Sequence, residues 1–551
     1  MENVNKFKRI RAVLSILSKY GFDDLLSRSG AIKYMPTRFK QSTRGKEINT
    51  FTLHKRIRLA LEELGPTYVK LGQMFSNRED ILPPELIAEL AELQDNVPPL
   101  PLNIDEYLTQ QLSINVSDHF EYINPSPIAS ASISQVYLGR LINGQKIVIK
   151  VKRTGIEETI KSDILIMKDL ASLFESAYEA AQKMNLKQVI RTFENNMKKE
   201  LSLTNELHNI ERFRKNFAEN EQIYVPLTYT ELSNNDVLTM EFVEGFKVND
   251  KEKIIELGIN PSQVSQDLIS LYLKQILEDG FFHADPHPGN VFIMPDKRYC
   301  FIDFGSMGSM TSYEKELCAS LIENFLLKNA KKIIFILKRL SINYEIQDER
   351  LLEKQVYDIF HMLEHTALNE LNVTDVIAKL KEIMATNHVL MPEFVYLLMR
   401  GISILEGIGK QLNPQLNVME SLKPFAAKYA KQQFNPKKIA QKSLQNAKLL
   451  VDYLQNLPED AMYLMEKVKD DKLTINHKVE GLEDMRKTVQ NATNRLTYAI
   501  IIAALSIGSS ILMMAEMPPL IYGNSVLGLL GFLISGILGL VIIYSIYKKD
   551  H

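Results

Sequence analysis

Cysteine is scarce in this chain, with only Cys300 and Cys318 among 551 residues. So few thiols exclude a disulfide-stapled scaffold, and neither cysteine lies in the spacing of a metal-ligand motif. Their scarcity fits a reducing environment facing the cytosol. The sequence therefore predicts a fold held by its core rather than by covalent cross-links.

An excess of charge of either sign is also lacking. Lys and Arg total 65 against 67 for Asp and Glu, a net charge of −2, which gives no electrostatic argument for a nucleic-acid partner. The start of the sequence lacks the basic, apolar and small-residue regions of a secretory signal, so we expect the bulk of the chain to stay where it is made. The length and the 45% apolar content predict at least two packed regions.

Two long apolar runs stand near the C-terminus. Residues 498–515 and 526–547 contain no Asp, Glu, Lys or Arg, and each is long enough to cross a bilayer as a helix. The short connector between them has turn chemistry and predicts a hairpin. Basic residues flank the pair and predict that everything before it is cytoplasmic. These flanking cations are Lys487, Arg495, Lys548 and Lys549. A buried helical pair in a soluble core is the alternative, but neither run shows a polar stripe.

The N-terminal third has helical periodicity. Residues 7–20 place apolar side chains at helical spacing among Lys8, Arg9 and Arg11, which fits either a helix lying on an anionic bilayer or a helix packed on its own domain. Helical patterning continues over residues 53–94. The proline-rich stretch at 97–102 then predicts a linker.

Strand patterns begin near residue 118. Residues 135–151 form two short strands around Asn143-Gly144, a dipeptide that favours a tight hairpin turn. Helical patterns occupy residues 157–218, and residues 236–243 form an apolar strand. Helices dominate beyond residue 262, except for a paired stretch at 291–303.

The most informative stretch runs from His283 to Asn290 and on, through two short strands, to Asp303-Phe304-Gly305. A hairpin there brings Asn290 beside Asp303 and supplies two oxygen ligands for a hard cation such as Mg²⁺. Asp285 lies on the same loop. An amide and two carboxylates converging on one pocket are what phosphoryl transfer from ATP requires, since metal ions neutralise the phosphates while a carboxylate orients the attacking group.

A lysine and an unusual loop complete this pattern. Lys150 ends a strand, where kinase-like folds place the lysine that contacts the nucleotide phosphates. The segment before that strand carries alanine and serine where a protein kinase has glycines, so nucleotide should adopt a different pose. The loop positions predicted to contact nucleotide are Ala129, Ser130, Ala131 and Ser132.

Together these features resemble the UbiB family of atypical, protein kinase-like proteins, also called AarF-type ubiquinone-biosynthesis kinases. The resemblance covers about residues 7–424, and its specific marks are Lys70-Leu-Gly-Gln73, the Ala/Ser-rich loop and the 283–290 loop. It implies an α+β, two-lobed protein kinase-like fold with an N-terminal helical extension, to which the sequence adds a C-terminal two-helix transmembrane hairpin. In this family the Lys-x-Gly-Gln motif covers the site where a protein substrate would otherwise dock.

The resemblance also implies roles for individual residues. Lys70 and Gln73 share a helical face, and the family pairs this lysine with a Glu-x-Asp motif whose aligned place here is Glu200-Leu-Ser202, without the second acid. The partner of Lys150 is left open between Glu194 and Glu200, on a helical run predicted over residues 192–212. Glu241 and Val243 lie on the strand whose backbone would bind adenine. A zinc role for His283 or His287 is disfavoured, because no cysteine is near.

These patterns predict five regions: a helical extension at 1–100, an N-lobe at 101–245, a helical C-lobe at 246–425, a helical linker at 426–495 and the hairpin at 496–551. The leading hypothesis is a membrane-anchored, ATP- and Mg-dependent kinase or ATPase that supports ubiquinone or another isoprenoid-quinone pathway. Its expected partners are a membrane lipid or quinone intermediate and quinone-biosynthesis proteins, with the kinase-like part on the cytoplasmic side of a cell membrane. The alternatives are a nucleotide-binding pseudokinase scaffold and a soluble small-molecule kinase, which would need neither Lys70 nor the hairpin.

Overall fold

A computed structural model describes most of the chain. The described residues are 2–23, 51–76, 82–93, 97–177, 186–344, 346, 348–365, 372–433, 482–515, 517–521 and 524–547. The chain divides into two units, Met1–Ile439 and Ala440–His551, which are described separately. Most of the linker predicted at 426–495 and the cations Lys548 and Lys549 lie outside the described residues.

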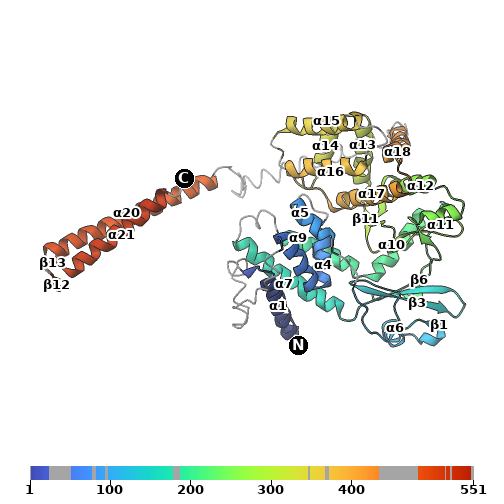
Figure 1. The fold of residues 1–551 in the computed structure, drawn as a ribbon, viewed down its shortest axis with the longest axis horizontal. Coiled ribbons are helices and arrows are strands. Elements are labelled where there is room, and N and C mark those ends of the chain that lie inside the picture. Colours follow the sequence, from blue (N-terminus) through green and yellow to red (C-terminus); the bar gives the residue numbers. More distant parts are fainter. Residues whose placement is uncertain are drawn as a thin grey trace, which may run out of the picture. The chain divides into compact units, whose positions relative to one another are not determined.

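The first unit begins with helices that pack on one another (Figure 1). They are α1 (Glu2–Lys19), α3 (Leu53–Leu64), α4 (Pro66–Phe75), α5 (Pro84–Ala91), α7 (Ile156–Ala177) and α9 (Leu186–Glu200). Val13 and Leu14 of α1 are buried in this packing, and Arg9 forms an ion pair with the fully buried Asp163 of α7. Of the two interpretations of α1, the structure shows the helix packed on its own domain.

An antiparallel sheet carries the predicted lysine. Its strands are β1 (Phe120–Ile123), β2 (Ala129–Ser130), β3 (Ser134–Leu141), β4 (Lys146–Lys152) and β6 (Val237–Glu241), in the order β1-β3-β4-β6 with β2 beside β3. Gly144 adopts φ 85° in the β3–β4 turn, a conformation that glycine accommodates without steric cost, so the predicted hairpin is confirmed. The helix α6 (Ile104–Leu112) packs on this sheet through Leu108.

The helical run predicted over residues 192–212 is wrong at its centre. The helix α9 ends at Glu200 and α10 (Leu203–Asn216) begins three residues later. Ser202 separates them, because its extended backbone places its side chain to accept a hydrogen bond from the Asn205 N–H as an N-cap. The change of direction matters for the site described below.

Short strands lie between this sheet and the C-terminal helices. One sheet has the order β5 (Ile223–Tyr224), β10 (Tyr299–Phe301), β9 (Val291–Ile293) and β7 (Phe246–Lys247), and β8 (Phe281–His283) pairs separately with β11 (Met307–Ser309). The antiparallel β9–β10 pair confirms the hairpin predicted at 291–303. Both strand pairs end at the 283–290 loop and thereby fix its two sides.

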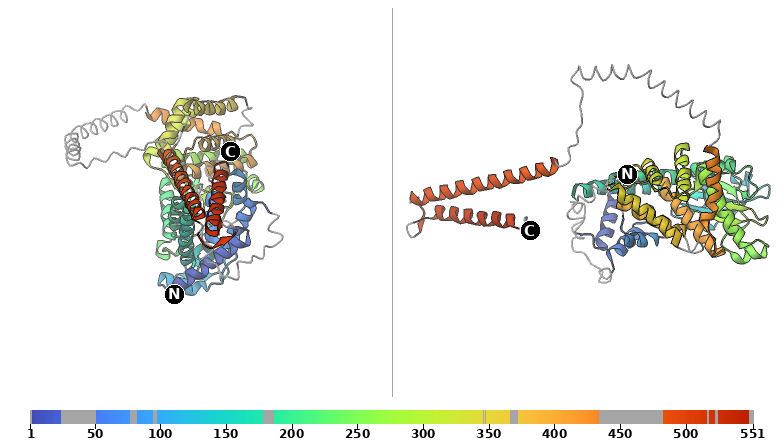
Figure 2. Two further views of the ribbon diagram at one scale, coloured as in Figure 1. Left: turned by 90° about the vertical axis from the view of Figure 1, so that its left-hand side faces the viewer. Right: turned by 90° about the horizontal axis from the view of Figure 1, so that it is seen from above.

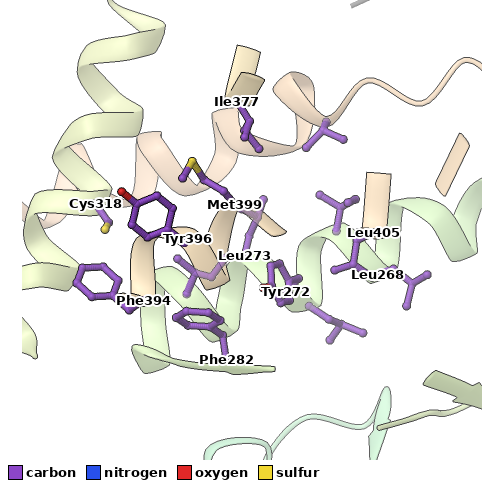
Figure 3. Packing of buried hydrophobic residues seen from close by; sticks show 14 of the residues in the cluster. Leu268, Tyr272, Leu273, Phe282, Cys318, Ile377, Phe394, Tyr396, Met399 and Leu405 are labelled. Atoms are coloured by element: carbon purple, nitrogen blue, oxygen red, sulfur yellow. The ribbon is translucent and has the colours of Figure 1, made fainter. Parts of the chain in front are cut away.

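The C-terminal helices of the first unit share the largest apolar core. They are α11 (Lys251–Glu256), α12 (Pro261–Lys274), α13 (Ser312–Leu326), α14 (Ala330–Leu340), α15 (Glu349–His365), α16 (Val373–Thr386), α17 (Glu393–Leu412) and α18 (Val418–Gln433). Figure 3 shows Leu268 and Tyr272 of α12 in the same cluster as Met399 and Leu405 of α17 and Phe282 of β8. The core therefore joins the strand before the loop to a helix more than a hundred residues later.

The described part of the second unit contains α20 (Leu482–Met514) and α21 (Val526–Tyr547), packed side by side in Figures 1 and 2, with the short strands β12 (Leu520–Ile521) and β13 (Asn524–Ser525) between them. The segment Ala492–Met514 is long and apolar enough to span a membrane, and almost none of its described residues is buried. That exposure argues against a buried pair in a soluble core. The apolar stretch of α21 whose side chains are described, Val526–Leu540, is shorter. The two helices pack on each other, and the structure supports one membrane span, in α20, by length and composition. The two-helix transmembrane hairpin stays a prediction.

Candidate active site

Lys150 lies in β4, the strand flanked by β3 and β6, and its side chain is 16% exposed. Its ammonium group donates to both carboxylate oxygens of Glu206 at 2.8 Å and to Oδ1 of Asp303 at 3.1 Å. Glu206 is 4% exposed, whereas the Asp303 side chain is half exposed. One lysine thus links β4, α10 and the end of the 291–303 hairpin.

Neither glutamate left open as the partner of Lys150 fills that place. Glu194 pairs with Lys168 and Lys198, and Glu200 pairs with Lys70. The reason is the break before α10. The prediction placed both glutamates on one continuous helix over 192–212, whereas two helices with different directions orient their side chains differently. A serine followed by a new apolar-periodic run is an N-cap signal that could have revealed the break.

The charges of this trio shift each other's ionisation. The charge of Lys150 holds the pKa of Asp303 well below its usual range. Burial would lower the pKa of Lys150, but the charges of Asp303 and Glu206 outweigh it and raise that pKa. Burial raises the pKa of Glu206 to about 7, although the neighbouring lysine opposes the shift. Asp303 is therefore the firmly ionised acid of the site.

The 283–290 loop is held by hydrogen bonds within itself. His283 is buried, with Nε2 3.2 Å from the Ile302 carbonyl, and its Nδ1 accepts from the Asp285 N–H at 3.2 Å. Because burial lowers the pKa of His283, a neutral ring that donates from Nε2 and accepts at Nδ1 satisfies both bonds. Asn290 donates from its side chain to the Asp285 carbonyl at 3.2 Å. These bonds give His283 a structural task.

The backbone brings Asn290 and Asp303, the two predicted cation ligands, close together, and their metal role stays a prediction. Ile302 N–H donates to the Asn290 carbonyl at 2.9 Å, which sets Asn290 opposite the residue before Asp303. Asp303 itself adopts φ 59°, an unusual conformation for a residue other than glycine, and it turns the chain directly after β10. An ionised carboxylate and an amide oxygen fit Mg²⁺, whose remaining ligands are commonly waters and substrate phosphates. Within the described residues no cluster of three or more His, Cys, Asp and Glu side chains forms a self-sufficient metal cage.

Asp285 has a partner that sequence reasoning missed. Arg400 of α17 donates from Nη2 to Asp285 Oδ1 at 3.1 Å across 115 residues of sequence. No local pattern links the two residues, because the packing of α17 on α12 brings them together. A sequence-only search for a cation near the loop finds none between His283 and Asn290.

The Ala/Ser-rich loop is anchored by Arg153, another residue that the sequence did not single out. Arg153 donates to the Ala131 carbonyl at 2.7 Å and to Ser130 Oγ at 2.6 Å. The same guanidinium donates to the carbonyls of Val97 and Pro98, so it ties the loop to the preceding linker. The remaining loop positions differ in exposure, since Ala129 is exposed and Ser132 is buried. This loop is fixed by side-chain bonds rather than left free by glycines.

The predicted adenine-binding strand ends at Glu241. Its carboxylate accepts from the Tyr224 hydroxyl at 2.6 Å and from the Leu227 N–H at 3.1 Å, so the side chain is structural. The Val243 N–H makes no hydrogen bond to the described part of the chain. That free donor stands where the sequence predicts an adenine contact.

The Lys-Leu-Gly-Gln motif lies on α4. Lys70 forms an ion pair with Glu200, as the motif comparison anticipated for a lysine and this acid. Gln73 donates from Nε2 to the Leu93 carbonyl at 3.1 Å. Gly72 between them is a packing requirement, because a Cβ there would meet Leu93 Cδ1 at 2.3 Å. The catalytic roles predicted for Lys70, Gln73 and Glu200 stay predictions.

Comparison with protein families gives three matches. Residues 92–337 match the ABC1 atypical kinase-like domain, residues 356–417 the UbiB helical domain and residues 480–548 the ABC1/UbiB kinase-like C-terminal domain. The first covers both lobes around Lys150 and Asp303, and the second covers most of α15 to α17. The chain thus matches family models both at its centre and at its C-terminal helices.

Comparison with individual proteins agrees with the family models. A probable protein kinase UbiB from Shewanella piezotolerans is 33% identical over 83% of this chain and 84% of its own. Another from Vibrio cholerae is 28% identical over 96% and 98%. An uncharacterised protein from the hydrogenase 1 5′ region of Clostridium pasteurianum is 27% identical over 99% of both chains.

Solved structures are more distant. A complex of Rv3197 with erythromycin from Mycobacterium tuberculosis aligns over 62% of this chain and 87% of its own, with 23% identity and a TM-score of 0.44. A Rio2 kinase complex with ADP, Mg²⁺ and phosphoaspartate from Chaetomium thermophilum aligns over 70% and 98%, with 14% identity and a TM-score of 0.24.

Proposed function

The chain belongs to the UbiB family of ABC1-type atypical kinase-like proteins, and we propose that it is a Mg²⁺-dependent enzyme that transfers or hydrolyses the γ-phosphoryl group of ATP. The observation that carries the proposal is the meeting of Lys150, Glu206 and Asp303 beside the Asp285 loop. A protein that binds nucleotide without catalysing phosphoryl transfer would not require all of these groups together.

Each group has a distinct task in this proposal. Lys150 is oriented by Glu206 and neutralises nucleotide phosphates, while Asp303 and Asn290 hold Mg²⁺ through oxygen ligands. The metal, when bound, neutralises charge on the phosphate oxygens. Asp285 orients the attacking hydroxyl or water and accepts its proton. The Ala/Ser-rich loop lies over the nucleotide, and the backbone at Glu241 and Val243 binds adenine.

We further propose that the acceptor is water or a small or lipid-soluble molecule connected with ubiquinone or another isoprenoid quinone. Two observations support this choice over a soluble protein acceptor. Lys70 on α4 is held by Glu200, next to the break that leads into α10 and Glu206, so the motif helix stands close to the nucleotide elements. The segment Ala492–Met514 is suited to a bilayer, where a lipid-soluble ligand is concentrated.

The test is phosphate release from ATP by the full chain in lipid, with and without Mg²⁺ and candidate quinone intermediates. Asp303→Asn should abolish Mg²⁺-dependent release while leaving a folded protein, because it removes the charge of the metal ligand and keeps its shape. Asp296→Asn is the matched control, since Asp296 pairs with Arg298 at the surface. Equal release from wild type and Asp303→Asn would contradict the proposal.

A nucleotide-binding scaffold that organises quinone-biosynthesis proteins is the second candidate. The fixed Ala/Ser-rich loop favours it, because Arg153 holds that loop by side-chain bonds to two of its residues. Nucleotide binding without any Mg²⁺-dependent release, together with intact association with such proteins, would support the scaffold over the enzyme.

Membrane attachment has its own test. A chain ending at Lys487 lacks the apolar segment of α20, and we propose that it fractionates as a soluble protein while the full chain sediments with membranes. Orientation with the kinase-like part in the cytoplasm is the accompanying proposal, measured by protease protection in sealed vesicles. Persistent sedimentation of the shortened chain would contradict the anchor assignment.

A further inference from the structure

The loop that carries Asp285 contains no lysine or arginine. From His283 to Asn290 its only titratable side chains are those of two histidines and the aspartate itself. Phosphoryl transfer spreads negative charge over the oxygens of the group in flight, and cations near the attacking side stabilise that charge. Lys150 is expected to contact the nucleotide phosphates and is already held between Glu206 and Asp303. The side from which the attacking water or hydroxyl approaches the phosphorus therefore needs a cation from elsewhere in the chain.

Arg400 is a cation that contacts this loop. Its Nη2 lies 3.1 Å from Asp285 Oδ1, which leaves Oδ2 of the carboxylate without an assigned protein partner among the described residues. The side chains of Arg400 and Asp285 are 39% and 27% exposed. Ion pairs at such exposure contribute roughly 0–1 kcal/mol to folding, so stability alone is a weak reason for this contact.

The backbone beside Arg400 is fixed by close packing. A Cβ on Gly401 would lie 1.8 Å from the Tyr272 hydroxyl, so glycine is what allows α17 to approach α12 at this point. Tyr272 is buried, and its ring meets Phe282 edge-on with centroids 6.2 Å apart. Phe282 stands three residues before Asp285. Figure 3 shows Tyr272 and Phe282 in one cluster. One side chain thus contacts both the helix of Arg400 and the strand that leads into the loop.

Two buried polar groups border the same contact. Among the described residues the Tyr272 hydroxyl has no hydrogen-bond partner, and the charge of Asp285 adds to burial in raising the pKa of this tyrosine. Gln275, in the π-helical turn that follows α12, accepts from the His283 N–H at 2.9 Å. In the part of the chain that the structure describes, Asp285 forms its ion pair with Arg400 of α17.

We propose that Arg400 is a positioning residue for the phosphoryl-transfer step: it fixes one oxygen of Asp285 and supplies the cation on the attacking side that the loop lacks. This inference rests on the proposed function. Asp285 Oδ2 accepts the proton of the attacking water or hydroxyl as the new O–P bond forms. The bond from the γ-phosphorus to the bridging oxygen breaks, and ADP leaves with that electron pair. Arg400 stays protonated throughout.

The test uses the full chain in lipid and compares Arg400→Gln and Arg400→Lys with wild type. Because Arg400 touches Asp285 rather than the nucleotide elements, Arg400→Gln should lower kcat about 100-fold while the KM and Kd for ATP stay within about 2-fold. Arg400→Lys keeps the charge but not the planar guanidinium group, so its kcat should lie between those of wild type and Arg400→Gln.

Lys410→Gln is the matched control, because Lys410 lies on the same helix and pairs with Glu406 instead of Asp285. Its kcat and its KM for ATP should equal those of wild type. If Arg400→Gln does not fold, as judged by lost ATP binding, the lysine variant decides alone: a kcat lowered about 10-fold with unchanged Kd supports the inference.

Two results would overturn it. An Arg400→Gln enzyme with wild-type kcat and KM would make the contact incidental, and one with raised kcat would make Arg400 an inhibitor of Asp285. Absence of Mg²⁺-dependent turnover in wild type is a different outcome, since it rejects the proposed function on which the inference rests. The two failures are thus told apart by the wild-type rate.

Discussion

Lys150 and Lys70 both form an ion pair with a glutamate, but the two pairs differ in how far they are exposed to solvent. Lys150 is mostly enclosed and lies between two carboxylates, of which Glu206 is almost fully buried and Asp303 is half exposed. Lys70 and its partner Glu200 are 19% and 35% exposed and connect two helices near the surface. Removing one partner of a buried pair leaves an uncompensated charge, whereas an exposed pair is screened by water. The difference predicts that Lys150 contributes both to the free energy of unfolding and to the candidate active site, whereas Lys70 contributes mainly to the site.

The largest effect is expected at Lys150. Lys150→Met should lower the free energy of unfolding by about 3 kcal/mol, because Glu206 stays buried without its cation, and should weaken ATP binding by at least about 100-fold. Denaturant unfolding and calorimetric titration measure the two effects. The double variant Lys150→Met/Glu206→Leu should regain much of the stability without regaining ATP binding. Equal instability of the single and double variants would contradict the uncompensated-charge explanation.

The pH dependence of Glu206 gives the next effect. Its pKa of about 7 lies above the ordinary 4.5, so the folded state binds this proton more tightly than the unfolded state. The resulting stabilisation is complete below about pH 4.5 and is lost as pH rises to about 7. The pKa of Asp303 is lowered, so its contribution to the free energy of unfolding is lost only as pH falls below the ordinary pKa of an aspartate, outside this pH window. Glu206→Gln should therefore flatten the decline of Tm between pH 4.5 and 7, and an unchanged slope would contradict the assignment.

An intermediate effect is expected where the two lysine sites are joined. Ser202 caps α10 and so separates the helix of Glu200 from the helix of Glu206. Ser202→Ala should cost about 1 kcal/mol of unfolding free energy, while Ser202→Asp, which keeps a capping oxygen, should be nearly neutral. Urea denaturation of both variants checks this. If alanine and aspartate are equally costly, the cap does not define the break.

The smallest stability effect is expected at Lys70. Lys70→Gln should change the free energy of unfolding by less than about 1 kcal/mol and should do so less at high salt, because the pair with Glu200 is partly exposed. Turnover of ATP should nevertheless change if the motif serves the site. A loss of stability as large as that of Lys150→Met would remove the contrast between the two lysines.

The sequence predicts well those parts of the site that are built from neighbouring residues. The Asn143-Gly144 turn, the 291–303 hairpin and the approach of Asn290 to Asp303 depend on local patterns that tertiary packing did not override. The partner of Lys150 was missed for a local reason as well, because the capping role of Ser202 was not recognised and one helix was assumed.

Other parts of the site depend on long-range packing that no single-sequence pattern contains. Arg400 reaches Asp285 across 115 residues, and Arg153 reaches Val97 across 56. A lone arginine in an apolar helix or after a strand has many possible partners, and only the packed helices and strands select one. Such contacts become visible only when the fold is known.

Arg153 has a mechanical consequence. A single guanidinium group donates from Nη2 to the carbonyls of Val97 and Pro98 and to Ser130 Oγ, and from Nε to the Ala131 carbonyl. Loss of this one side chain would therefore release the Ala/Ser-rich loop and the preceding linker together.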